Sequence, residues 1–171
     1  MIVTILRHGE AGSASVDAER ELTPRGIDDI SFAGQQFHNA CEARGLPTPV
    51  IILHSAWLRT TETADIFART FQNCSVVPEP ALQPGGDIFG VTQMLLHIGE
   101  ESPGDSTGDT HILLVSHQPL VSELADYYLG MANSVPGLSP GGLFTVNMDV
   151  PARNGAILLF WALPPEYQAG I

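Results

Sequence analysis

The sequence contains no lysine, and its positive charge is scarce. Its seven basic residues are all arginines, against 19 aspartates and glutamates, which gives a formal net charge of −12. Nucleic acids and anionic membrane surfaces both require a basic face on a protein that binds them, so this charge balance argues against both as partners. Because the chain as a whole repels anions, any anion site must be a local concentration of arginine.

Cysteine and metal-binding patterns are equally sparse. The two cysteines, Cys41 and Cys74, lie far apart and form no CxxC pair, which favours two reduced thiols packed near helices. The six histidines show neither an HxxxH pair nor a Cys/His cluster with the spacing of zinc ligands. The sequence therefore predicts no metal site and no cofactor.

Long apolar runs are absent as well. No run reaches the length that a bilayer-spanning helix needs, and residues 1–20 lack the basic region and apolar core of a signal peptide. We therefore expect a cytoplasmic protein. A length of 171 residues suits one well-buried domain covering residues 1–171, which we expect to be a monomer.

What the chain does contain is an alternation of strand-like and helix-like segments. β-Branched apolar runs predict strands at residues 2–6, 50–53, 75–77 and 112–115, and helical spacing predicts helices at about 24–44, 58–71, 91–98 and 120–129. Thr23 and Pro24 suit the N-cap and first turn of the first of these helices. Residues 11–21, 78–90, 102–109 and 134–142 have the composition of loops.

The last part of the chain has a different pattern. Residues 143–148 and 156–163 are predicted strands, and Asn154-Gly155 between them is a strong hairpin signal. Alternating strands and helices imply a parallel sheet covered on both faces. The predicted fold is thus α/β, a three-layer α/β/α arrangement with a mostly parallel central sheet and an antiparallel edge.

Three of the predicted buried strands end in residues that carry chemistry. The first ends at Arg7 and His8, the second at His54-Ser55 with Arg59 just beyond, and the strand at 112–115 ends at Ser116-His117. If these strands are parallel, their carboxyl ends lie at one edge of the sheet, where α/β proteins bind ligands. The helices that begin near Ala56 and Pro119 would direct their N-termini to the same place, which favours an anion.

Two guanidiniums and two imidazoles at one sheet edge suit phosphoryl transfer. Arg7, Arg59 and a protonated His117 would hold the phosphoryl oxygens. A neutral His8 would attack phosphorus through one ring nitrogen while a hydrogen bond fixes the other, and water would hydrolyse the resulting phosphohistidine. The arginines would supply the charge that a metal ion supplies elsewhere, so this chemistry is metal-independent.

These motifs resemble branch 1 of the histidine phosphatase superfamily, which has the phosphoglycerate-mutase-like fold. The similar segments cover most of the chain: Arg7-His8-Gly9-Glu10, Leu22-Thr23-Pro24-Arg25-Gly26, the segment from Ser55 to Ala64, and Ser116-His117. Within that superfamily the short chain, residues 116–121, Arg20 just before Leu22-Thr23, and the turn at residues 84–87 are similar to SixA-type phosphohistidine phosphatases.

The resemblance implies a role for each of these residues. His8 would be the nucleophile, and Arg7, Arg59 and His117 would bind the phosphate, with Arg20 as an additional anion contact from the long loop. Many members of branch 1 carry a glutamate that protonates the leaving group, whereas here Gln83 stands at the expected place. Glu79 is a substitute, although the prolines on both sides of it fix its direction.

The missing acid bears on the substrate. An alcohol needs a proton as it leaves, whereas an imidazole leaving a phosphoramidate needs less help. We therefore expect hydrolysis of phosphohistidine on a signalling protein of the histidine-containing phosphotransfer kind. A phosphomonoesterase acting on small phosphoesters and a non-catalytic phosphate-binding module are the alternatives. The intact set of two arginines and two histidines argues against the latter.

Several residues near these motifs also have plain structural explanations. Arg20 and Arg25 can simply pair with nearby carboxylates, and such exposed pairs contribute little. Glu10 is expected to accept a hydrogen bond from a cation or a backbone amide. Trp57 is expected to pack or to form the rim of the crevice, and His54 to lie beside the site without touching substrate.

Overall fold

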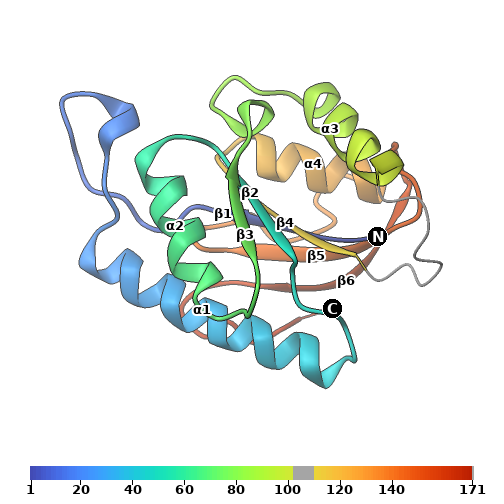
Figure 1. The fold of residues 1–171 in the computed structure, drawn as a ribbon, viewed down its shortest axis with the longest axis horizontal. Coiled ribbons are helices and arrows are strands. Elements are labelled where there is room, and N and C mark those ends of the chain that lie inside the picture. The colour runs from blue at the N-terminus through green and yellow to red at the C-terminus, as the bar shows by residue number, and fades with distance from the viewer. Residues whose placement is uncertain (102–109, 171) are drawn as a thin grey trace.

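The computed structural model describes residues 1–101 and 110–170. A six-stranded sheet with the order β3-β2-β4-β1-β5-β6 forms the centre (Figure 1). The strands are β1 (Ile2–Arg7), β2 (Ile51–His54), β3 (Ser75–Pro78), β4 (His111–Ser116), β5 (Leu143–Met148) and β6 (Ala156–Ala162). The helices are α1 (Pro24–Ala43), α2 (Leu58–Ala68), α3 (Ile88–Glu101) and α4 (Leu120–Leu129), with short 3-10 turns η1 (Asp17–Glu19) and η2 (Pro80–Leu82).

The sheet is mostly parallel. β1 pairs with β4, β4 with β2, and β2 with β3, all in parallel, whereas β5 is antiparallel to β1 and β6 antiparallel to β5. Helices cover both faces, which explains why β1 and β4 are continuous apolar runs rather than alternating ones. The predicted three-layer fold with an antiparallel edge is confirmed.

Each face of the sheet has its own apolar core. α1 and α2 lie on one face, and α3 and α4 on the other (Figure 1). The first core is built around the aromatic rings of Phe37, Phe67 and Phe160, and the second around Phe144 and Tyr128. Aromatic rings bury large apolar areas, so these two layers hold the sheet in place and fix where its strands end.

The start of α1 follows the predicted capping pattern. The Thr23 hydroxyl oxygen accepts a hydrogen bond from the Gly26 amide at 3.0 Å, and Pro24 occupies the first turn. At the other end, Gly45 has a φ of 64°, a left-handed conformation that terminates the helix region at little cost. The cap matters for the site because α1 begins beside the residues that follow β1.

Helix boundaries differ from the predictions at both ends of α3, which continues to Glu101 beyond the predicted Ile98, and at the end of α2. α3 begins at Ile88, three residues before the predicted Val91, because the Asp87 carboxylate accepts a hydrogen bond from the Gly90 amide at 2.8 Å and caps the helix. α2 ends at Ala68, where tighter turns carry the chain to the buried Phe71. The predicted loop at 102–109 lies outside the described residues.

The predicted hairpin of β5 and β6 is confirmed, with a longer connection than two residues. Residues 149–155 join the strands, and Asn154 adopts a left-handed φ of 56°. The Asn154 amide donates to the carbonyl of Tyr127 at 3.0 Å, which ties the connection to the end of α4. The hairpin is therefore anchored to the end of α4. Its strand β5 pairs with the edge of β1 that β4 leaves open.

Other expectations concern absences. Cys41 is buried, Cys74 is half-buried, and neither is in a disulfide, as predicted. Within residues 1–101 and 110–170, no helix combines the length and apolar character needed to cross a bilayer. Across the same residues, no three His, Cys, Asp or Glu side chains gather in a way that could hold a metal ion.

Candidate active site

The register of β1 and β4 brings two histidines together. Arg7 pairs with Ser116 at the end of the parallel ladder, and the His8 amide donates to the Ser116 carbonyl at 3.1 Å. The next residue on each strand is a histidine, and the ring centroids of His8 and His117 lie 5.1 Å apart. Two residues that are far apart in sequence therefore face one another because the strands run in parallel to the same edge.

Arg59 reaches the same edge from β2. The Ser55 amide continues the ladder by donating to the Val115 carbonyl at 3.2 Å, and α2 begins three residues later. Arg59 is thus in the first turn of α2, and its Nε donates to Nε2 of His8 at 3.2 Å. The structure brings together the predicted set of Arg7, His8, Arg59 and His117.

The hydrogen bonds of His8 fix its tautomer. Nδ1 lies 2.8 Å from the Gly9 carbonyl oxygen, which can only accept, so Nδ1 carries the proton. Nε2 accepts from Arg59 and therefore holds a lone pair. Burial, with contributions from Arg59 and Arg7, lowers the pKa of His8 to about 4. His8 is consequently neutral at physiological pH, the state that a nitrogen nucleophile requires.

His117 differs from the expectation of a protonated imidazole. Both of its ring nitrogens are buried and have no hydrogen-bond partner among the described residues. Burial, followed by the effect of His8 and Arg59, lowers the pKa of His117 to about 3. The imidazole is therefore neutral as it stands, because two cations and a second imidazole surround it in a poorly solvated place. A bound dianion would reverse part of this effect and favour the protonated form.

Arg7, which directly precedes His8 at the end of β1, is held by a backbone contact. One of its terminal nitrogens donates to the Leu138 carbonyl at 2.8 Å, whereas its Nε is buried and has no partner within residues 1–101 and 110–170. Burial lowers the pKa of Arg7, yet a guanidinium stays charged in proteins. Arg7 thus brings a fixed positive charge and an unsatisfied N–H donor to the sheet edge.

Asp17 is a participant that the sequence analysis did not identify. In η1, its backbone carbonyl accepts from one terminal nitrogen of Arg59 at 2.7 Å, and its carboxylate lies 3.4 Å from the other. The same carboxylate pairs with Arg20 at 3.0 Å. Asp17 sits in an irregular loop with no periodic pattern, so nothing in its spacing distinguished it from a solvated acid.

Arg20 is tied to its own loop. Its three guanidinium nitrogens donate to the carbonyls of Gly12 and Ala11 and to the carboxylate of Asp17. Its ion-pair partner is Asp17, a nearby carboxylate of the kind that the plain structural explanation required. Arg20 therefore orders residues 11–20 beside Arg59, and direct contact with a phosphate stays a prediction.

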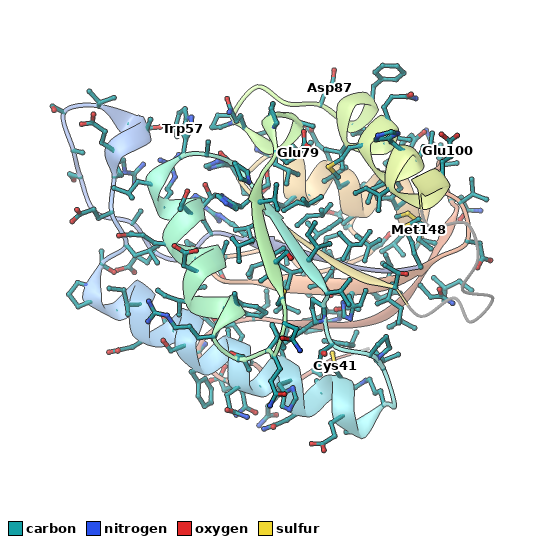
Figure 2. All side chains as sticks on the ribbon, viewed as in Figure 1. Cys41, Trp57, Glu79, Asp87, Glu100 and Met148 are labelled. Carbon is teal, nitrogen blue, oxygen red and sulfur yellow. The ribbon has the colours of Figure 1, made fainter. Side chains whose placement is uncertain are left out.

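Trp57 forms one wall of the site. The Arg59 guanidinium carbon lies 4.6 Å from the centre of the indole ring, and the ring meets His117 edge-on at 5.5 Å. In Figure 2, Trp57 and Glu79 lie toward the same side of the view, and Cys41 lies toward the other. Stacking on the indole stabilises the guanidinium while keeping water from it. Trp57 therefore lies at the rim of the site, packed against Arg59 and His117, as expected.

The remaining acids near the site are engaged elsewhere. The Glu79 carboxylate accepts from the Ala81 amide at 2.9 Å and caps η2. The Glu10 carboxylate accepts from the Thr23 hydroxyl at 2.8 Å, rather than from the expected cation or backbone amide. His54 is buried beside the site, with Nδ1 donating to the Ser55 carbonyl.

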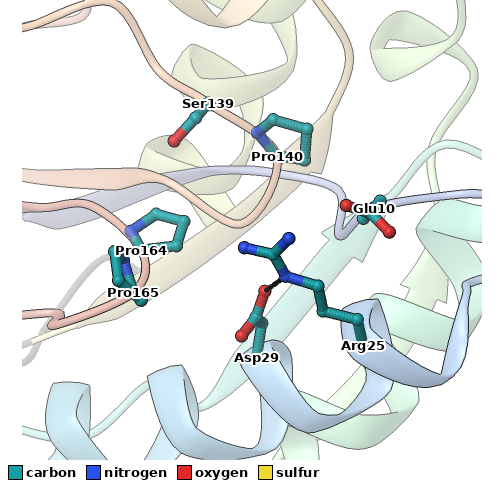
Figure 3. A pocket seen from close by; sticks show the side chains of 7 residues that line it. All are labelled: Glu10, Arg25, Asp29, Ser139, Pro140, Pro164 and Pro165. Atoms are coloured by element: carbon teal, nitrogen blue, oxygen red, sulfur yellow. Dashed lines mark ion pairs between the residues drawn. The ribbon is translucent and has the colours of Figure 1, made fainter.

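Arg25 lies in a different pocket. Its Nε pairs with Asp29 at 3.6 Å, and the two line a cavity of about 180 Å³ with Glu10, Ser139 and three prolines (Figure 3). Neither the two histidines nor Arg59 lines this cavity. The pairing with Asp29 is one of the plain explanations given above for Arg25.

Comparison with known proteins agrees with this geometry at the level of the fold. No family model and no curated protein sequence matches the chain. Among solved structures, the protein histidine phosphatase SixA complexed with tungstate is similar over 96% of this chain and 97% of its own, with a TM-score of 0.76 and 24% identity.

Two further structures show the same likeness. A SixA-type protein from Agrobacterium tumefaciens has a TM-score of 0.73 and 19% identity over 95% of this chain and 97% of its own. The mycobacterial glucosyl-3-phosphoglycerate phosphatase complexed with VO3 has a TM-score of 0.66 and 16% identity over 96% and 97%. The chain therefore has the fold of the histidine phosphatases, as its motifs indicated.

Proposed function

We propose that this protein is a metal-independent phosphatase that uses His8 as its nucleophile. The observation that carries the proposal is the state of His8: Nδ1 is pinned to a carbonyl, Nε2 holds a lone pair, and the ring is neutral. Arg59 donates to that nitrogen, the His117 ring lies 5.1 Å from the His8 ring, and the charge of Arg7 also acts on His8. Such an arrangement is suited to attack on phosphorus with the oxygens held by cationic donors.

The reaction proceeds in two displacements. Nε2 of His8 forms a bond to phosphorus while the bond from phosphorus to the leaving group breaks, and the electron pair of that bond departs with the leaving group. Arg59 transfers its Nε hydrogen bond from His8 to a phosphoryl oxygen as the lone pair turns to phosphorus. Water then attacks the phosphohistidine, which releases inorganic phosphate and restores His8.

His117 has a specific part in this scheme. Its two buried, unpartnered nitrogens make it a donor and an acceptor with no competing contact. A phosphoryl dianion beside it would raise its pKa by charge attraction, so it would take up a proton and donate to a phosphoryl oxygen. The ring is held at its place by Trp57 and by the start of α4 directly after it.

We propose phosphohistidine on a signalling protein as the substrate class. The carboxylates of Glu79 and Glu10 are held by the Ala81 amide and by Thr23, and the position expected for an acid is Gln83. Without a placed acid, a leaving imidazole is favoured over a leaving alcohol. The likeness to SixA, named as a protein histidine phosphatase, supports the same choice.

A phosphomonoesterase is the second candidate. The likeness to glucosyl-3-phosphoglycerate phosphatase, although at a lower TM-score, favours a small phosphoester. The two candidates are separated by comparing kcat/KM on a phosphohistidine protein with kcat/KM on simple phosphate esters. A strong preference for the esters would remove the leaving-group argument.

The decisive experiment is trapping of the phosphoryl group. A radiolabelled phosphohistidine protein mixed briefly with this chain should leave acid-labile label on His8, identified by mapping the labelled peptide. His8→Ala should carry no label and lose turnover by about 10³-fold or more, because it removes the nucleophile. His38→Ala, at a half-buried histidine of α1 whose ring contacts Phe71 instead of the site, is the matched control. Label on another residue, or turnover by His8→Ala, would refute the assignment.

A further inference from the structure

We infer that Asp17 is a specificity-determining residue that competes with the substrate's phosphoryl group for Arg59. The inference rests on the proposed function, because it takes a phosphoryl group as the ligand of this site. It assigns a role to the first residue of the 3-10 turn η1, in the loop that follows β1. Asp17 favours substrates that make binding contacts outside the phosphate site over small anions that make none there.

The competition follows from the donors of Arg59. Each of its three guanidinium nitrogens already donates: Nε to His8, and the two terminal nitrogens to the carbonyl and carboxylate of Asp17. A two-point grip on a phosphoryl group uses neighbouring nitrogens of the guanidinium fork. The fork has five N–H groups, so its Nε side can still reach a phosphoryl group, but that group then shares the Arg59 charge with Asp17, which holds both terminal nitrogens.

Charge repulsion opposes the binding of both anions to Arg59 at once. A hydrogen bond from Arg20, with the positive charge of Arg59, lowers the pKa of Asp17, so the carboxylate is ionised at neutral pH. A phosphoryl dianion placed at the same donors would stand beside this carboxylate. The two like charges would repel each other across the Arg59 guanidinium, whose side chain is only 6% exposed, and the 56% exposure of Asp17 limits this repulsion.

The Asp17 side chain is also able to move away from Arg59. Its side chain is 56% exposed, and it is carried by a three-residue turn within the irregular segment 11–21. The carboxylate contact with Arg59 is long at 3.4 Å, whereas the contact with Arg20 is 3.0 Å. Asp17 can therefore move away from Arg59 while it remains paired with Arg20 on the same loop.

This arrangement has a consequence for selectivity. A small anion such as inorganic phosphate must displace Asp17 with only the contacts of the site itself, to Arg7, Arg59 and His117, to compensate. A phosphoryl group carried by a protein or a larger molecule gains contacts outside the site, and remote binding energy can drive the displacement. Asp17 thus weakens binding of inorganic phosphate, which is also the product of the proposed reaction.

The test is the affinity for inorganic phosphate, measured by calorimetry on the full chain. Asp17→Asn keeps the size of the side chain and removes its charge, and we expect the Kd to fall roughly tenfold, equivalent to about 1.4 kcal/mol. Glu19→Gln is the matched control: it removes the same charge from the same turn, and the Glu19 side chain makes no hydrogen bond or ion pair among the described residues. Its Kd should stay within about twofold of the wild type, because exposed charges are screened.

A second measurement uses the wild type alone. If phosphate displaces Asp17, hydrogen exchange of the amides at 12–20 should become faster when inorganic phosphate is added. Slower exchange would mean that the loop closes on the anion, which would overturn the inference. So would an Asp17→Asn variant that binds phosphate no better than the wild type, an equal gain in Glu19→Gln, or no binding by any of the three proteins.

These outcomes are separate from those of the proposed function. Transfer of a phosphoryl group to His8 tests catalysis, whereas the Kd for phosphate involves no bond to phosphorus. A chain that binds phosphate more tightly after Asp17→Asn but never labels His8 would keep the inference and refute the nucleophile. A chain that labels His8 but shows no gain would do the reverse.

Discussion

The Nε–H of Arg59 donates to Nε2 of His8 across 3.2 Å, so the first turn of α2 and the end of β1 are joined at the atom proposed to attack phosphorus. The bond requires α2 to begin close to the carboxyl end of β2, which neighbours β4 and lies two strands from β1. One guanidinium thereby fixes the orientation of the imidazole. In the proposed reaction it would also lie beside the phosphoryl oxygens.

Replacement of Arg59 by lysine should not preserve activity. Lysine carries the charge but lacks the planar fork that contacts His8 and Asp17 together. We expect Arg59→Lys to lower kcat/KM by about 10²- to 10³-fold on a phosphohistidine protein, as for loss of an oxyanion donor. Arg69→Lys, at the exposed C-terminal end of the same helix, should have no measurable effect. Equal activity of Arg59→Lys and the wild type would show that charge alone suffices.

The sequence predicted this site because its main residues lie at strand ends. Apolar runs identify β1, β2 and β4, and parallel pairing then requires Arg7-His8 and Ser116-His117 to meet. Asp17 could not be found in this way, since no periodicity governs a loop and its contacts with Arg59 depend on tertiary geometry. The charge state of His117 was also beyond the sequence, because it depends on burial and on which cations end up beside the ring.

Helix boundaries with a local sequence signal could also be predicted, whereas features set by tertiary packing could not. Capping by Thr23 and Pro24 placed the start of α1 correctly, since the signal lies within a few residues. The earlier start of α3 has an equally local cause in Asp87, but the prolines and glycines around it masked the signal. The alternation of elements predicted a mostly parallel sheet, but not the order of its strands, because that order depends on how both faces pack.

The ionisation of His8 should be shifted to acid pH. Burial and the nearby arginines lower its pKa to about 4, from 6.5 for an unperturbed histidine. In a titration followed by NMR of the ring carbon-bound protons, the resonance assigned to His8 by its absence from His8→Ala should move near pH 4. A midpoint near 6.5 would contradict the proposal that the nucleophile is neutral because it is buried.

Stability should fall as the pH is lowered from about 6.5 toward 4. His111 is fully buried, with Nδ1 donating to the Pro47 carbonyl and Nε2 bonded to the Thr4 hydroxyl, and burial lowers its pKa to about 4. Between the two values the unfolded chain binds a proton that the folded chain does not, so acidification favours unfolding.

His111→Gln removes this titration while keeping a polar side chain. We expect the dependence of the unfolding free energy on pH to become shallower, by up to about 1.4 kcal/mol per pH unit, in urea denaturation between pH 4.5 and 6. His8 and His117 would account for the dependence that remains, since their pKa values are lowered too. An unchanged slope would mean that His111 has the same pKa in the folded and the unfolded chain.

α1 approaches the backbone of Glu10 closely at Gly26. Substitution of this glycine by alanine should therefore have an unusual effect on stability. Glycine to alanine within a helix normally stabilises by about 1 kcal/mol. At Gly26, however, an added Cβ would lie inside 3.0 Å of the Glu10 carbonyl oxygen, a backbone atom that cannot turn aside. Steric overlap of this kind costs about 1–3 kcal/mol, so the sign of the effect should reverse.

Gly99 in α3 is the matched helical control. An added Cβ there meets only the mobile end of the Met1 side chain, at 3.3 Å. Thermal unfolding should therefore show a lower melting temperature for Gly26→Ala and an equal or higher one for Gly99→Ala. Because Glu10 lies two residues from His8, Gly26→Ala should also lower kcat/KM at a temperature where it remains folded. A stable and fully active Gly26→Ala would show that α1 can shift away without disturbing the end of β1.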